Sequence, residues 1–159
     1  MIIFIYILAI TVANLTIAQF GPWVSPINSF LLIGLDMVLR DKLHDKWVGN
    51  GLLIRMTGLI VAAGIISFLL NPATLMISVA SSVAFGVAMI VNSIVYQMNI
   101  KNKWLIRSNV SNTAGSAVDS LLFPTIAFGV IMPEIIILQF TAKVVGGFMW
   151  SLLFNKKKV

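Results

Sequence analysis

Two residues of opposite charge lie inside long apolar stretches of this sequence. Asp119 lies in a run from about residue 108 to 131, and Lys143 lies in a run from about 134 to 154. At 1.5 Å per helical residue, they lie about 16 Å and about 13 Å from the shared end of their two runs. A charge buried in lipid is costly unless it is paired or hydrated. The two residues therefore predict an ion pair, or the two ends of one ligand site.

Amide and hydroxyl side chains follow the same helical periodicity. At 100° per residue, Ser108, Asn112 and Asp119 lie on one narrow stripe of a helix, and Gln139 precedes Lys143 by one turn. Hydrocarbon offers these groups no partner, so we expect them to face the protein interior. Two further candidates from other runs are Asn14 and Asn92. For these two, a role as hydrogen-bonding contacts between helices is an equally good interpretation.

The composition defines the kind of element that positions these residues. The chain has 159 residues, of which 59% are hydrophobic and 10% are charged. A soluble domain carries roughly 25% charged residues. This composition excludes a soluble enzyme and a nucleic-acid-binding domain, and it indicates an integral membrane protein.

A helix needs about 20 apolar residues to cross the hydrocarbon core of a bilayer. Runs of that kind occur at about 2–20, 24–40, 51–70, 73–98, 108–131 and 134–154. We therefore predict an all-α polytopic membrane protein, a bundle of six transmembrane helices that forms a single domain over residues 1–159. The second run is diluted by Pro22, Pro26 and Asn28, which makes it one of the two weakest.

The basic residues predict the orientation of the bundle. They gather in the segments 40–55, 101–107 and 156–158, which six spans place on one side of the membrane. Lys and Arg accumulate in cytoplasmic loops, so we expect both termini in the cytoplasm. The net charge of +6 then reflects topology and attraction to anionic headgroups, with no nucleic acid as partner.

The segment after the second run is predicted to be a polar connector from Asp41 to Asn50. Asp36 and Arg40 stand four residues apart just before it, where they are expected to form a structural ion pair at the inner interface. His44 lies beside Asp45 in this connector and is expected to be solvated.

Sequence patterns of enzymes are missing. The chain has one His and no Cys, which excludes disulfides and a His/Cys metal site of the ordinary kind. It has no nucleophile elbow, phosphate-binding loop or dinucleotide fingerprint. We therefore expect no catalysis, no metal and no cofactor. Hydrogen bonding and charge suit the binding and passage of a small molecule.

Several segments resemble the VUT family of small membrane carriers, the transporters of queuosine precursors. The resemblance covers most of the chain, and it lies on Ala13-Asn14-Leu15, on 39–45, on Arg107-Ser108-Asn109, on 118–123 and on 140–145. The chain has Gly115-Ser116 and Gly146-Gly147 where the family often carries a Gln and an acidic residue.

The resemblance implies a transporter in the cytoplasmic (inner) membrane that imports 7-cyano-7-deazaguanine or a related purine-like base. The base would bind between helices at the midplane of the lipid bilayer. Asp119 would accept hydrogen bonds from its N–H groups, and Lys143 would balance that charge in the empty state and meet a carbonyl or nitrile. Phe123 or Phe128 would stack on the ring. A homo-oligomer is compatible with this hypothesis, and so is proton coupling with Asp119 as the titrating group.

A different interpretation is a membrane subunit that transports nothing and serves interaction or assembly. In that case the polar residues would lie at separate pairwise helix contacts. In a carrier they would line one cavity.

Overall fold

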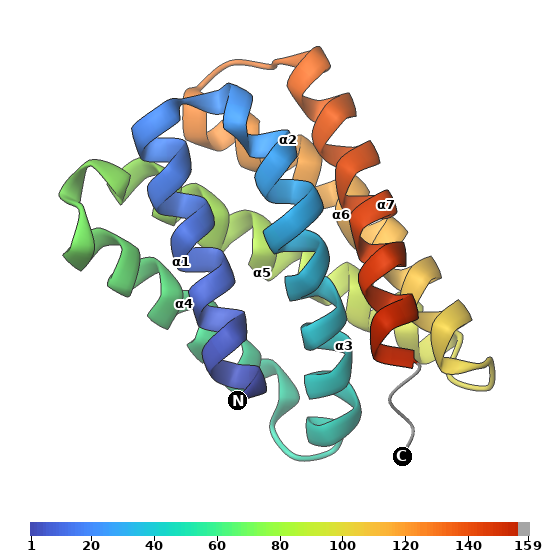
Figure 1. Ribbon diagram of the computed structural model, residues 1–159. Helices are drawn as coiled ribbons and strands as arrows, with labels where there is room; N and C mark the ends of the chain where they lie inside the picture. Colours follow the sequence, from blue (N-terminus) through green and yellow to red (C-terminus); the bar gives the residue numbers. More distant parts are fainter. Residues whose placement is uncertain (156–159) are drawn as a thin grey trace.

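The computed structural model describes residues 1–155, which are almost wholly helical (Figure 1). The helices are α1 (Ile2–Phe20), α2 (Ser25–Asn28), α3 (Gly34–Trp47), α4 (Leu52–Leu70), α5 (Leu75–Met98), α6 (Trp104–Phe128) and α7 (Pro133–Asn155). The 3-10 turns η1 (Pro22–Val24) and η3 (Pro72–Thr74) precede α2 and α5, and the π-helical segment η2 (Ser29–Ile33) joins α2 to α3. The described residues contain no strand.

These elements form six membrane-length rods, and the chain is an all-α polytopic membrane protein. Within the described residues, five rods are long and apolar enough to cross a bilayer: Ile2–Phe20, Pro22–Trp47, Leu52–Leu70, Pro72–Met98 and Pro133–Asn155. The remaining rod is α6, which has 25 residues. It is more polar because its buried face carries Ser, Asn and Asp side chains.

The ends of α1 and α4 follow from local chemistry. Gly21 ends α1 with φ of 78°, a conformation that glycine adopts at little cost, and Pro22 then starts η1. Asn71 ends α4, and its side-chain oxygen accepts a hydrogen bond from the backbone N–H of Ala73 at 3.0 Å. Both helices therefore end within a residue of where the apolar runs were predicted to end.

The second rod, Pro22–Trp47, is one continuous helix whose hydrogen-bonding pattern changes three times. Pro22 and Pro26 lack a backbone donor, and the regular helical pattern gives way to η1, α2 and η2 before α3 begins at Gly34. π-Helical turns of this kind are frequent at functional sites.

The prediction of a polar connector over 41–50 is wrong. The helix α3 continues to Trp47, and only residues 48–51 form a turn. Asp41 and His44 are buried, so this segment belongs to the bundle and has interior partners. The prediction assigned this segment to water because its residues are charged. In the structure, hydrogen bonds to other helices keep the segment helical and packed.

The helices α5 and α6 form the most extensive pair, and they pass behind the other helices in Figure 1. Their contact is close because small residues face each other. A Cβ atom on Gly115 would lie 3.3 Å from the carbonyl oxygen of Ala88. Small residues at membrane helix interfaces allow such approaches.

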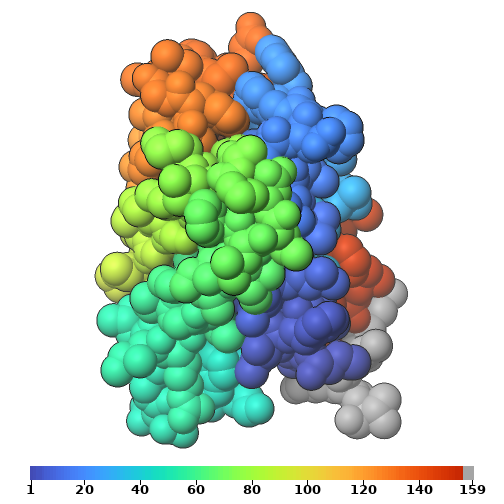
Figure 2. All heavy atoms as spheres, turned by 90° about the vertical axis from the view of Figure 1, so that its left-hand side faces the viewer, coloured from blue at the N-terminus to red at the C-terminus, as the bar shows by residue number. Residues whose placement is uncertain are grey.

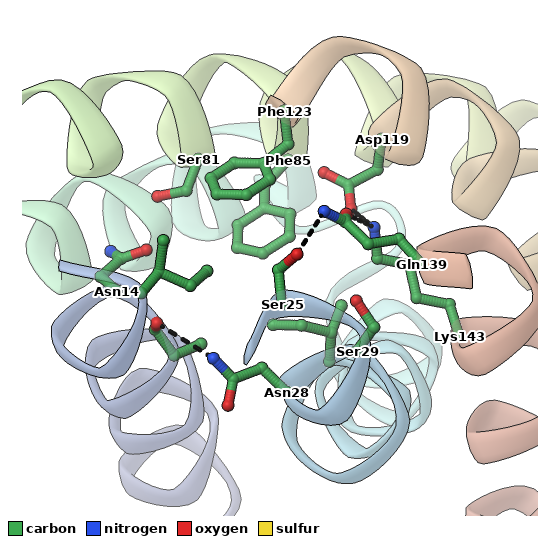
Figure 3. Close-up of a pocket in the computed structure, with 13 residues that line it drawn as sticks. Asn14, Ser25, Asn28, Ser29, Ser81, Phe85, Asp119, Phe123, Gln139 and Lys143 are labelled. Carbon is green, nitrogen blue, oxygen red and sulfur yellow. Dashed lines mark hydrogen bonds and ion pairs between the residues drawn. The ribbon is translucent and has the colours of Figure 1, made fainter. Parts of the chain in front are cut away.

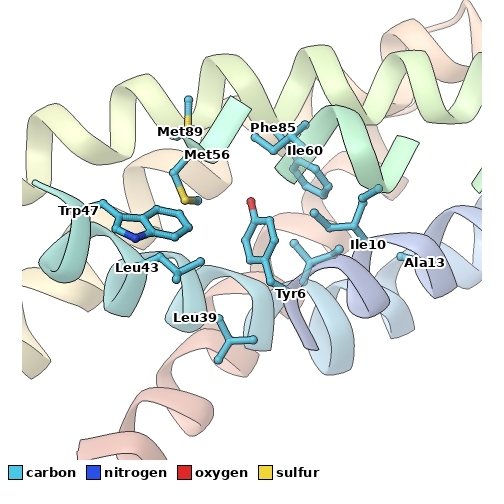
Figure 4. Close-up of a cluster of buried hydrophobic side chains, with 12 residues drawn as sticks. Tyr6, Ile10, Ala13, Leu39, Leu43, Trp47, Met56, Ile60, Phe85 and Met89 are labelled. Atoms are coloured by element: carbon cyan, nitrogen blue, oxygen red, sulfur yellow. The ribbon is translucent and has the colours of Figure 1, made fainter. Parts of the chain in front are cut away.

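Two apolar clusters hold the bundle together. The larger joins α1, α3, α4 and α5 and includes Tyr6, Leu43, Trp47, Met56 and Phe85 (Figure 4). The smaller includes Ile17, Ile77, Ala80, Ala84 and Phe123.

The outer surface is apolar on its helical flanks. Figure 2 shows the face formed by α4 and α5, with α1 beside them. Large exposed side chains of α4 and α5 include Ile54, Ile65, Leu69, Leu75 and Val79. Such a surface suits contact with acyl chains.

The connections at the two ends of the bundle differ in charge. The N-terminus, the α3–α4 turn and the α5–α6 connection lie in the lower part of Figure 1, and the connections at Gly21, Asn71 and 129–132 lie in its upper part. The lower connections adjoin Lys46, Arg55, Lys101 and Lys103, whereas Glu134 starts the helix after the last upper connection. The third predicted basic group, at 156–158, lies outside the described residues.

Candidate functional site

A small cavity lies between the two apolar clusters, in the interior of the bundle (Figure 3). Side chains from α1, the irregular second rod, α5, α6 and α7 line it. The lining includes five of the residues proposed from the sequence, namely Asn14, Asp119, Phe123, Gln139 and Lys143. The open volume of about 20 Å³ suffices for about one water molecule, so the cavity is in a closed form.

Asp119 and Lys143 form an ion pair at the wall of this cavity. Asp119 Oδ2 lies 2.6 Å from Lys143 Nζ, and each side chain is 2% exposed. The prediction that these two residues pair across α6 and α7 is confirmed. Charge-assisted hydrogen bonds of this kind are short and strong, which makes the burial of both groups tolerable.

The ammonium group of Lys143 has a complete set of partners. Besides Asp119, it donates to Ser120 Oγ at 2.9 Å and to Gln139 Oε1 at 3.0 Å. Since an ammonium has three N–H donors, none is left over. The amide nitrogen of Gln139 donates in turn to Ser25 Oγ at 2.8 Å, which links α7 to the irregular second rod.

The cavity wall carries acceptor oxygens that have no hydrogen bond. The second carboxylate oxygen of Asp119, Oδ1, is buried and has no partner. Asn14 donates its amide to Ser67 Oγ, and Asn28 donates its amide to the carbonyl of Ala13 and to Thr16 Oγ1. Both Asn side chains thereby keep their carbonyl oxygens free of a hydrogen bond within the described part of the chain. These oxygens are suited to accept hydrogen bonds from N–H groups.

The remaining wall is apolar and aromatic. Phe85 of α5 and Phe123 of α6 lie next to each other between Ser81 and Asp119 in Figure 3, and Ile17 and Ile33 contribute aliphatic surface. Phe123 also packs edge-on against Phe128, with ring centroids 6.2 Å apart. An aromatic face beside a set of acceptors is suited to a flat, polar ring.

Three of the residues proposed from the sequence lie elsewhere. Asn92, Ser108 and Asn112 are buried in a separate network around Asp41. Asp41 Oδ2 accepts hydrogen bonds from Ser108 and Asn112, and Asn112 accepts one from Asn92 at 2.8 Å. The stripe on α6 therefore serves two places, with Asp119 at the cavity and the earlier residues at this network.

Two further expectations about α3 are wrong. Asp36 and Arg40 are both buried, but no ion pair within 4.0 Å joins them, and α3 extends beyond both residues as an interior element. His44 is 3% exposed, contacts the side chain of Gln97 at 2.9 Å and packs on the ring of Tyr96.

Several lining residues were not identified from the sequence. They are Ser25, Asn28, Ser29, Ser81 and Phe85. The signal for the first three was present, because Pro22, Pro26 and the polar residues around them interrupt the second apolar run. A proline-interrupted apolar segment is a pointer to a transporter binding site.

The fold and the cavity together define a polytopic membrane protein with a partly polar cavity enclosed in its helix bundle. Residues 1–154 match the model of the family described as "Putative vitamin uptake transporter", and the chain belongs to this family. No curated protein and no solved structure matches the chain. The family assigns the chain to membrane transport of a small molecule.

Proposed function

We propose that this protein imports a queuosine precursor, 7-cyano-7-deazaguanine or a related purine-like base, across the cytoplasmic membrane. The chain acts as a single domain with both termini in the cytoplasm, and the base binds in the cavity at the middle of the bundle. The observation that carries this proposal is the state of Asp119, since one carboxylate oxygen is paired with Lys143 and the other is buried without a partner.

The chemistry of a guanine-like edge fits this pair of residues. Such an edge presents a carbonyl oxygen, a ring N–H and an exocyclic amine in a row. A carboxylate accepts two N–H groups side by side, as it does from arginine. The base would take both oxygens of Asp119, and Lys143 would turn its ammonium to the carbonyl, so that the two charges remain neighbours.

The other walls suit the rest of the base. Phe85 and Phe123 offer ring faces for stacking. The carbonyl oxygens of Asn14 and Asn28 are acceptors for further N–H groups. An adenine-like edge carries an acceptor where Asp119 requires a donor, so the site should reject it strongly.

The base needs more room than the closed cavity offers. The second rod is the element best suited to move, because its irregular turns carry Ser25, Asn28 and Ser29 on the cavity wall.

Convergence of polar groups on one cavity supports a carrier over an interaction subunit. Asn14, Asn28, Ser81, Asp119 and Lys143 come from five different rods and line the same space. Residues that served only pairwise helix contacts would be spread over separate interfaces.

Uptake of a labelled 7-deazaguanine base by cells that cannot synthesise it tests the proposal. Expression of the protein should give uptake, which Asp119→Asn and Lys143→Met each abolish while both proteins remain in the membrane. Glu134→Gln is the control, because this exposed acid is distant from the cavity. An excess of unlabelled guanine-edged base should compete, and an adenine-edged base should not. Wild-type uptake by both site variants would contradict the assignment of the site.

A further inference from the structure

A second group of buried charges lies on α3. Asp36, Arg40 and Asp41 are 1%, 3% and 0% exposed. No ion pair within 4.0 Å joins Arg40 to either carboxylate in the described part of the chain. The three residues are not part of the cavity wall.

This cluster contains buried polar atoms without partners. They are Asp36 Oδ1, Arg40 Nε, Arg40 Nη2, Asp41 Oδ1 and, on the neighbouring α5, Asn92 Oδ1. Buried polar atoms are nearly always hydrogen-bonded, so a group of exceptions on neighbouring residues requires an explanation.

The charges in the interior do not balance. The buried carboxylates are Asp36, Asp41 and Asp119, whereas the buried permanent cations are Arg40 and Lys143. If all were ionised, one negative charge would remain uncompensated inside the bundle, which is costly. Binding of one positive charge removes that cost. His44 is buried, packs on the ring of Tyr96 and contacts the side chain of Gln97, and these surroundings suit a neutral imidazole.

The hydrogen bonds indicate which of the three carboxylates is neutralised by the bound positive charge. Asp41 Oδ2 accepts from Ser108 and Asn112, and Asp119 is paired with Lys143, so both are stabilised as carboxylates. Asp36 forms no ion pair within 4.0 Å in the described part of the chain, and its Oδ1 is buried without a partner. Its carboxyl group is therefore the one best suited to be neutral.

The surroundings of Asp36 favour a proton over a metal cation. The groups that act on it are Tyr6 of α1, Arg40 and Asp41 of α3, and Asp119 of α6, whose charge Lys143 neutralises. Within the described residues, no group of three His, Cys, Asp or Glu side chains is placed to hold a metal ion, whereas a proton needs a single carboxyl group.

We propose that Asp36 is the binding site of a proton whose movement drives substrate uptake. This inference rests on the proposed function, because the proton must be coupled to a transported base. The Asp36 carboxylate takes a proton from hydronium and leaves water, and in the opposite step the carboxylic acid returns the proton to water on the cytoplasmic side. The ionised carboxylate can then bind the unpartnered Nε and Nη2 of Arg40, which gives α3 two distinct arrangements.

Transport assays on purified protein in vesicles distinguish coupling of uptake to protons from binding of the base. Wild-type protein should accumulate labelled base when an inward pH gradient is imposed, in sodium-free buffer. Asp36→Asn, which imitates the neutral acid, should retain exchange of labelled for unlabelled base but lose accumulation down to the level without a gradient. Asp36→Glu should restore it, and Glu134→Gln should behave as wild type. Accumulation by Asp36→Asn at the wild-type level, or accumulation that follows a sodium gradient, would overturn the proton site.

Infrared difference spectra test the proton without any substrate. The wild-type protein should show the C=O stretch of a protonated carboxyl group that disappears in alkaline buffer. This band should be absent from Asp36→Asn and present in Glu134→Gln. A wild-type spectrum without a band that depends on Asp36 would refute the inference by itself. A wild-type protein that shows the band but exchanges no base would refute the proposed substrate and leave the proton site standing.

Discussion

Gly146 of α7 lies directly against the backbone carbonyl of Phe30 in η2. A Cβ atom on Gly146 would overlap the carbonyl oxygen of Phe30, and a Cβ atom on Gly34 would lie 2.8 Å from the carbonyl carbon of Gly146. The irregular second rod and α7 therefore approach to backbone contact, one turn after Lys143. This contact holds the proline-interrupted segment beside the ion pair, since Ser25 on that segment is bound by Gln139 of α7.

Gly146→Ala should disrupt this contact. The added methyl group meets backbone on the other side, which cannot move aside as a flexible side chain would, and overpacking of this kind costs about 1–3 kcal/mol or more. The expected result is a lowered melting temperature in detergent and reduced uptake. Gly147→Ala is a matched control on the next residue, because a Cβ atom there meets nothing within 4 Å. Equal stability of the two variants would contradict the close packing.

The buried ion pair should show strong coupling in a double-mutant cycle. Asp119→Asn leaves the ammonium of Lys143 without its counter-charge, and Lys143→Met leaves the carboxylate of Asp119 alone. Breaking a buried pair in this way costs about 3–5 kcal/mol. The double variant should be more stable than either single variant, because neither charge is then left unpaired. Thermal unfolding in detergent measures the loss of stability in the two single variants and in the double variant. If the loss in the double variant equals the sum of the two single losses, the two side chains do not interact.

The sequence was sufficient to predict the apolar helices and the central ion pair. Lengths of about 20 residues and the positions of Gly21 and Pro72 gave the bounds of α1 and α4, because lipid-facing helices must be apolar along their length. Asp119 and Lys143 were found because charges in such helices are rare.

Other parts depended on three-dimensional contacts that periodicity does not encode. The helix α3 runs on through Arg40, Asp41 and His44, because α5 and α6 supply these polar side chains with interior surroundings. Asn112 and Asp119 share one helical stripe yet reach different sites, since α6 crosses the length of the bundle. The position of each polar residue along the length of the helix determines which other side chains it contacts.

Asn112 should be important for stability and not for substrate recognition. Its amide group joins Asp41, Ser108 and Asn92 outside the cavity. Asn112→Ala leaves a buried carboxylate and a buried amide short of partners, which costs about 1–3 kcal/mol. We expect a lower melting temperature but an unchanged KM for the base. A KM raised as much as in a cavity variant would place Asn112 in the binding site.

Phe123 should contribute to affinity through its ring. It lines the cavity beside Asp119, and stacking of a base on an aromatic side chain is worth about 1–3 kcal/mol. Phe123→Leu preserves an apolar wall but removes the ring face, so KM should rise about tenfold while the amount of folded protein changes little. Phe128→Leu is the matched control, because Phe128 touches Phe123 edge-on without lining the cavity. An unchanged KM for Phe123→Leu would show that the base does not stack on Phe123. A similar rise in KM for both variants would indicate a shared effect on packing.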